Sequence, residues 1–118
     1  MQLKKINQLK KEIEKILNDN KAKEIKSISL KGKTSIADYM IIANGHSSKH
    51  IQSLAEILLN ELKENGINNC HLEGKDSSEW KLIDAFDIIV HIFHPEKRKF
   101  YNLERMWSEL IPKEKLMI

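Results

Sequence analysis

The chain has 118 residues, enough for one hydrophobic core, so we expect a single domain over residues 1–118. Hydrophobic residues make up 41% and charged residues 31%, as in globular proteins, and no apolar run reaches the roughly 20 residues of a membrane-spanning helix. The net charge of +3 combines +6 over residues 1–34 (ten Lys, four acidic residues) with −3 over residues 35–118 (ten basic, thirteen acidic). The basic excess therefore belongs to the first segment and does not by itself indicate a nucleic-acid-binding protein.

Two different periodicities predict the first helix and the first strand. Apolar residues recur at helical spacing over residues 3–18, which predicts an amphipathic helix. In residues 24–31, Ile28 and Leu30 alternate with polar residues, which predicts a half-buried strand. The Lys-rich helix lacks interleaved aromatic residues that would stack on bases, so we expect its apolar stripe to cover a sheet.

A continuous apolar run and then a helical stripe follow. After a loop at 32–36, residues 37–44 are almost all apolar, which is typical of a strand covered on both faces. Ser47 or Ser48 can cap the start of a helix, and Gly66 ends it. The apolar stripe of this helix is Ile51, Leu54, Ala55, Leu58, Leu59 and Leu62.

Three short strands and a last helix complete the predicted fold. The strands lie over about 69–74, 79–84 and 87–93, and the run IIVHIF at 88–93 predicts that the last of them is central and buried. Pro95 suits the first turn of a helix, and Pro112 ends that helix. The order α-β-β-α-β-β-β-α indicates an α/β domain, a mixed five-stranded sheet with flanking helices.

Two stretches of sequence resemble one protein family. ADYMIIANGHSSKH, which begins at residue 37, combines Ala-Asp-Tyr with an apolar run, Gly and Ser-Ser. EWKLIDAFDIIVHIFHPEKRKFYNLERMW, at 79–107, carries Trp, Leu and Asp on one strand, a His on the next, and a helix reading Pro-Glu-x-Arg-x-Phe-Tyr-x-Leu-Glu. Both stretches are similar to the Iojap-like ribosomal silencing factors. One departure is Ala85-Phe86, where the family often has an aromatic residue followed by Gly.

The resemblance implies a nucleotidyltransferase-like fold without nucleotidyltransferase activity, and no cofactor. It implies homodimers, and binding to ribosomal protein L14 of the large subunit. Since that protein lies where the small subunit docks, a bound silencing factor would block subunit association and repress translation. The family is not enzymatic, so we expect a binding protein.

An acidic stretch carries the expected contact. Residues 73–87 hold five acidic residues and two Lys, which suits a basic ribosomal surface. Trp80, Leu82 and Asp84 share one face of their strand. Trp80 and Leu82 are then either core residues or apolar anchors of an interface, and the resemblance favours the interface. The expected partner-binding residues are Trp80, Leu82, Asp84, Phe86, Asp87, Arg98 and Tyr101.

The rival function is a small nucleotide-binding transferase. It would use the Asn44-Gly45-His46-Ser47-Ser48 turn to hold a phosphate and a pair of carboxylates to hold a metal ion. No Asp-x-Asp or Asp-x-Glu pair stands on the following strands. Asp84 and Asp87 flank a tight turn, where they more often form an acidic surface or accept turn N–H groups.

The remaining polar candidates have ordinary structural interpretations beside functional ones. Cys70, His71, His91 and His94 lack the paired spacing of a zinc site, and His91 in an apolar run is typical of a hydrogen-bonded core histidine. Cys70 lacks the cationic neighbours of a reactive thiol. Arg98, with Arg105 and Lys97–Lys99, would either contact neighbouring rRNA or form a solvated helix face.

Cysteine content and the first residues indicate the compartment. The single cysteine excludes an internal disulfide and fits a reducing environment. Residues 1–15 lack the apolar core of a secretion signal, and Glu12, Glu14 and the absence of Arg are not typical of a mitochondrial presequence. We therefore expect a cytoplasmic protein.

Overall fold

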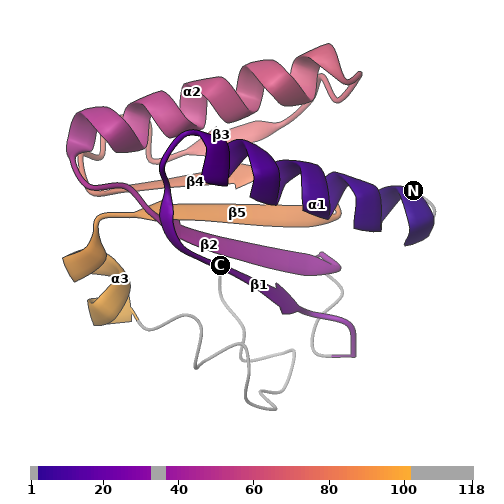
Figure 1. Cartoon of the computed structure of the whole chain (residues 1–118), viewed down its shortest axis with the longest axis horizontal. Helices are drawn as coiled ribbons and strands as arrows, with labels where there is room; N and C mark the ends of the chain where they lie inside the picture. Colours follow the sequence, from indigo (N-terminus) through magenta and orange to yellow (C-terminus); the bar gives the residue numbers. More distant parts are fainter. Residues whose placement is uncertain (1–2, 33–36, 102–118) are drawn as a thin grey trace.

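The computed structural model describes residues 3–32 and 37–101 (Figure 1). Helices and strands follow one another in the predicted order. They are α1 (Leu3–Asp19), β1 (Lys23–Ser29), β2 (Tyr39–Asn44), α2 (Ser48–Glu64), β3 (His71–Glu73), β4 (Trp80–Asp84), β5 (Ile88–Phe93) and α3 (Pro95–Tyr101). The predicted end of the last helix at Pro112 lies outside the described residues.

The five strands form one mixed sheet in the order β1-β2-β5-β4-β3, which confirms the predicted five-stranded sheet. Strands β2 and β5 are parallel, and the other neighbours pair antiparallel. The two parallel strands lie at the centre because they are apolar on both faces. Helices α1 and α2 cover the same face of the sheet, and α3 lies at one end of it (Figure 1).

The core has two parts, one on each face of the sheet. Alternate residues of β2 and β5 point to opposite faces, so Ile41 and Val90 pack with the helices while Met40 and Ile89 pack on the other side. The apolar stripes of α1 and α2 supply the helix side of the first part. The second part consists of Ile28, Leu30, Ala37, Met40, Ile42, Leu82, Ile89 and Phe93, with Trp80 packed against it.

Local signals placed the ends of α2 as predicted. Ser47 is the N-cap, and its hydroxyl accepts the His50 backbone N–H at 3.0 Å. Gly66 follows the C-cap Asn65 in a left-handed conformation, with φ of +88°. Strand ends were predicted less well: the strand expected over about 69–74 is only three residues long in the structure.

Candidate partner-binding site on strand β4 and the β4–β5 turn

The turn between β4 and β5 presents an aromatic side chain to solvent. Phe86 is 55% exposed, which is unusual for a large hydrophobic residue, and its backbone is left-handed with φ of +68°. The Asp84 carboxylate accepts the Phe86 N–H at 2.9 Å, and the Asp87 N–H donates to the Ala85 carbonyl at 2.9 Å. These two bonds hold the turn closed with Phe86 at its tip.

The one departure from the resemblance, Phe86 where the family often has glycine, lies at a residue with a left-handed backbone. Glycine adopts a positive φ without steric cost, whereas a residue with a Cβ atom is strained there by about 1 kcal/mol or more. The chain therefore keeps an aromatic ring at a position whose backbone suits glycine. Strain of this kind persists where the surrounding structure imposes it, and it is often found at functional sites.

The two aspartates of the turn have different roles. The Asp84 side chain binds the turn N–H of Phe86, as expected for an aspartate beside a tight turn. The Asp87 carbonyl accepts the backbone N–H groups of Asp38 and Tyr39 at 2.8 and 3.2 Å, which ties the start of β5 to the start of β2. Within the described residues, no three His, Cys, Asp or Glu side chains come close enough together to hold a metal ion.

Trp80 and Leu82 differ in exposure although they share a face of β4. Leu82 is only 7% exposed and belongs to the core, so the expectation that it presents an apolar anchor at the surface is wrong for the isolated chain. Trp80 is half-buried and packs against the same core. The reason is position: Leu82 pairs with His91 in the middle of β5, while Trp80 pairs with Phe93 where β5 ends.

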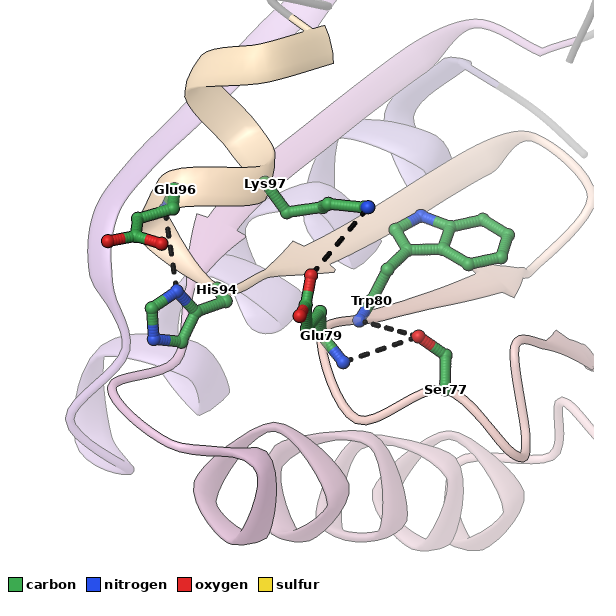
Figure 2. A network of polar contacts seen from close by, with 6 residues as sticks. All are labelled: Ser77, Glu79, Trp80, His94, Glu96 and Lys97. Carbon is green, nitrogen blue, oxygen red and sulfur yellow. Dashed lines mark hydrogen bonds and ion pairs between the residues drawn. The ribbon is translucent and has the colours of Figure 1, made fainter.

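A polar network fixes the start of β4 (Figure 2). The Ser77 hydroxyl accepts the backbone N–H groups of Glu79 and Trp80 at 3.2 and 3.1 Å. The Glu79 carboxylate forms an ion pair with Lys97 of α3 at 3.7 Å. The Lys97 side chain is thus paired with an acidic group beside β4 and remains partly exposed. Strand β4 is therefore tied both to the loop before it and to α3.

Lys81 is a structural lysine that the sequence analysis missed. Its side chain is buried, and its ammonium group donates to the carbonyls of Gly74, Lys75 and Ser77 at 2.7, 2.9 and 2.9 Å. Three converging carbonyls replace the water that a buried ammonium loses. The available signal was its place between the apolar residues Trp80 and Leu82 of β4, because a lysine buried there needs hydrogen-bond acceptors.

His91 is a hydrogen-bonded core histidine, as predicted. It is 4% exposed, its Nδ1 accepts the indole N–H of Trp80 at 3.2 Å, and its ring lies parallel to that of Phe93 with centroids 5.5 Å apart. Burial lowers the pKa of His91 from 6.5 to about 4, because the charged imidazolium would lose its hydration. At neutral pH the ring is therefore uncharged.

The other candidate ligands also have structural partners. The Nδ1 of His94 accepts the backbone N–H of Glu96 at the start of α3, at 3.4 Å (Figure 2). Burial, and then the charge of Asp84, raise the pKa of the Cys70 thiol, which opposes thiolate formation and agrees with the prediction of an unreactive cysteine. The N–H of His46 donates to His50 Nδ1 at 3.0 Å, so the strand–helix turn uses this N–H, like that of His50, within the chain.

Arg98 fits neither of the two interpretations considered for it. It is 8% exposed, so it does not lie on a solvated helix face, and its guanidinium donates to the Glu24 carbonyl and to Asn44 Oδ1, the latter at 2.9 Å. Glu24 lies in a register shift of β1, with φ of +52°, which turns its carbonyl toward α3. Arg98 therefore joins α3 to β1 and β2. The Tyr101 side chain and Arg105 lie outside what the structure describes.

Charge separates across the sheet. The exposed lysines Lys21, Lys23, Lys26 and Lys31 lie on or beside the edge strand β1. Exposed Glu73, Asp76 and Glu79 and half-buried Asp84 and Asp87 lie at the other side, on or beside β3 and β4. Together with exposed Phe86 and half-buried Trp80, this acidic side can contact a basic surface by both charge and apolar area.

Comparisons with known proteins give one consistent result. A family model described as "Ribosomal silencing factor during starvation" matches residues 3–117. The ribosomal silencing factor RsfS of Zymomonas mobilis is 49% identical over 78% of this chain and 69% of its own length. That of Bacillus subtilis is 37% identical over 78% of each chain. The Arabidopsis thaliana protein named "Protein Iojap-related, mitochondrial" is 33% identical over 82% of this chain and 55% of its own.

Solved structures of two bacterial proteins have the same fold. A crystal structure from Chromobacterium violaceum superposes with a TM-score of 0.82 and 32% identity, covering 99% of this chain and 95% of that one. A second, from Bacillus halodurans, has a TM-score of 0.75 and 35% identity over 86% and 94%. The predicted sheet with flanking helices is thus the fold of these relatives, while its likeness to nucleotidyltransferases stays a prediction.

Proposed function

The chain belongs to the ribosomal silencing factor family, and from that premise we propose that it binds the large ribosomal subunit through ribosomal protein L14. Occupying that protein blocks association with the small subunit and represses translation. The relatives carry the name of a regulatory factor and not of a catalyst. The proposed activity accordingly needs no chemistry, only a surface that binds firmly and a body that occupies the space of the other subunit.

The observation that carries this proposal is the exposed Phe86 at the tip of the β4–β5 turn, with Trp80 and acidic side chains on the same strand pair. Aromatic rings supply most of the binding energy in many interfaces, since they bury a large apolar area at small entropic cost. Asp84 and Asp87 add negative charge that speeds encounter with a basic ribosomal protein and orients it. Leu82 supports Trp80 from the core.

Further parts of the proposal concern partners and location. We propose that the protein is a homodimer, and that neighbouring rRNA adds a contact through lysines such as exposed Lys99 and those beside β1. A cytoplasmic location follows from the proposed partner, because bacterial ribosomes are cytoplasmic. In the described residues, no helix is both long and apolar enough to cross a membrane.

Co-sedimentation with isolated ribosomal subunits tests the function. We expect binding to large subunits and not to small ones, and inhibition of subunit joining when the protein is bound first. Equal binding to both subunits, or to neither, would exclude the proposal. Trp80→Ala should weaken large-subunit binding by about 30-fold, the effect of a typical aromatic anchor of about 2 kcal/mol.

A charge reversal tests the acidic contact. Asp84→Lys should weaken binding strongly, because an attraction to a basic partner becomes a repulsion. Glu56→Lys is the matched control, since Glu56 is exposed on α2 and the same charge change occurs away from β4. Both variants should be melted alongside, because Asp84 also holds the turn. Equal binding by the two variants would place the interface elsewhere.

A further inference from the structure

The indole of Trp80 is held from two sides. Its N–H donates to Nδ1 of His91 at 3.2 Å, and the two ring centroids are 6.4 Å apart. On another side lies the backbone of Gly74, so close that a Cβ atom there would stand 2.8 and 3.0 Å from Cε3 and Cζ3 of the indole and 2.7 Å from the Trp80 carbonyl oxygen. Only glycine fits at position 74, both for this approach and for its φ of +78°.

The backbone around Gly74 is itself anchored. The buried ammonium of Lys81 binds the carbonyls of Gly74, Lys75 and Ser77, and the hydroxyl of Ser77 binds the N–H of Trp80. The loop before β4 is therefore fixed at several points to the strand that carries the indole. The backbone of Gly74 is therefore held in place beside the indole ring of Trp80.

The state of His91 shows what this histidine contributes. Because the indole N–H can only donate, Nδ1 must be unprotonated, so the neutral ring carries its hydrogen on Nε2. That Nε2 is buried and, within the described residues, has no hydrogen-bond partner, which costs stability. A phenylalanine would stack on Phe93 equally well and avoid this cost. What histidine offers, and phenylalanine lacks, is the acceptor for Trp80.

We propose that His91 and Gly74 are positioning residues that hold the indole of Trp80 in one orientation for contact with a protein partner. This inference rests on the proposed function, in which Trp80 is an anchor of the interface. A side chain already fixed in its bound orientation loses little freedom on binding, whereas a mobile one must be ordered first. Releasing the indole should weaken binding by about threefold to tenfold, although Trp80 itself is still present.

Two glycine variants separate the positioning effect from backbone strain. Gly74→Ala places a Cβ against the indole, whereas Gly66→Ala, at φ of +88°, places one where nothing lies within 4 Å. Both substitutions strain the backbone similarly. We expect Gly74→Ala to weaken large-subunit binding by the stated factor and to shift the indole N–H resonance of Trp80 in a nitrogen–proton spectrum. Gly66→Ala should change neither.

Two histidine variants test the acceptor and do not depend on Gly74→Ala being folded. His91→Phe keeps a ring beside Phe93 and removes the acceptor. His91→Asn keeps an acceptor, since its amide oxygen stands near the place of Nδ1. We expect His91→Phe to shift the Trp80 indole resonance and to weaken large-subunit binding. His91→Asn should restore much of the original resonance position and much of the binding.

The outcomes distinguish this inference from the function on which it rests. If Trp80→Ala binds large subunits normally, the anchor and the positioning role both fail. A second outcome is that Trp80→Ala loses binding, while Gly74→Ala binds large subunits as tightly as Gly66→Ala and His91→Phe binds as tightly as the unaltered chain. The proposed function then stands and the positioning role is overturned. Loss of binding by Trp80→Ala, Gly74→Ala and His91→Phe, with Gly66→Ala unaffected, supports both.

Discussion

Mild acid should destabilise the folded chain through His91. The pKa of this buried imidazole is lowered from 6.5 to about 4 in the fold, so between these values the unfolded chain binds a proton that the folded chain does not. The contribution of neutral His91 to stability is fully present above pH 6.5 and is lost as the pH falls toward 4. The change of stability with pH therefore has the opposite sign to that of a histidine which gains an acidic partner on folding.

The size of the effect follows from the width of this window. Each pH unit inside it costs about 1.4 kcal/mol, so about 2 kcal/mol is lost by pH 5 and about 3 kcal/mol by pH 4. A domain of this size has a total stability of roughly 5–15 kcal/mol, so a change of this size is readily measured. Near pH 5 most carboxylates are still ionised, which keeps their contribution small.

Urea unfolding of the unaltered chain and of His91→Phe, each at about pH 7 and pH 5, gives the test. His46, His50, His71 and His94 are present in both proteins, so whatever they contribute cancels in the comparison. The unaltered chain should lose about 2 kcal/mol more than the variant between the two pH values. An equal loss in both proteins would show that folding leaves the pKa of His91 unchanged, and it would refute the argument from burial.

Further predictions concern the turn, the buried lysine and the absence of catalysis. In urea unfolding, Phe86→Gly should be about 1 kcal/mol more stable than Phe86→Ala, because glycine adopts the positive φ without strain. Both variants should lose large-subunit binding, and equal stability of the two would refute the backbone strain. Lys81→Met should cost about 2 kcal/mol or more in thermal melts, because it removes the ammonium group that three backbone carbonyls bind. Lys75→Met at an exposed site should cost little, and similar costs for the two variants would contradict the buried network. No nucleoside triphosphate should be turned over with Mg²⁺; turnover abolished by Asp84→Asn would contradict a non-enzymatic function.

Side-chain periodicity in the sequence was sufficient to predict the elements and their order. Helices and strands repeat at 3.6 and 2 residues, and a chain that buries one face must place its apolar residues at those spacings. The continuous apolar runs of β2 and β5 likewise placed these strands at the centre of the sheet. Local chemistry was equally readable, since the Ser47 cap and the Gly66 end of α2 depend on neighbouring residues alone.

The candidate site was predicted only in outline. The sequence identified the β4 strand, the acidic stretch and an aromatic residue at position 86. It could not show that Leu82 is fully buried while Trp80 is only half-buried. Both residues obey the same alternation along β4. Their difference in exposure arises from which residue of β5 each one pairs with. That depends on the strand pairing and cannot be predicted from the sequence of β4 alone.

Long-range contacts explain what only the tertiary structure decided. Arg98 is buried because a carbonyl 74 residues away in sequence, freed by a register shift in β1, comes to lie beside it. Gly74 and His91 both touch Trp80, but only the folded loop and the adjacent strand bring them there. The sequence alone determined which side chains must leave water, because that depends on spacing along one element. Which groups they meet there depends on how distant elements pack, and no local pattern encodes that.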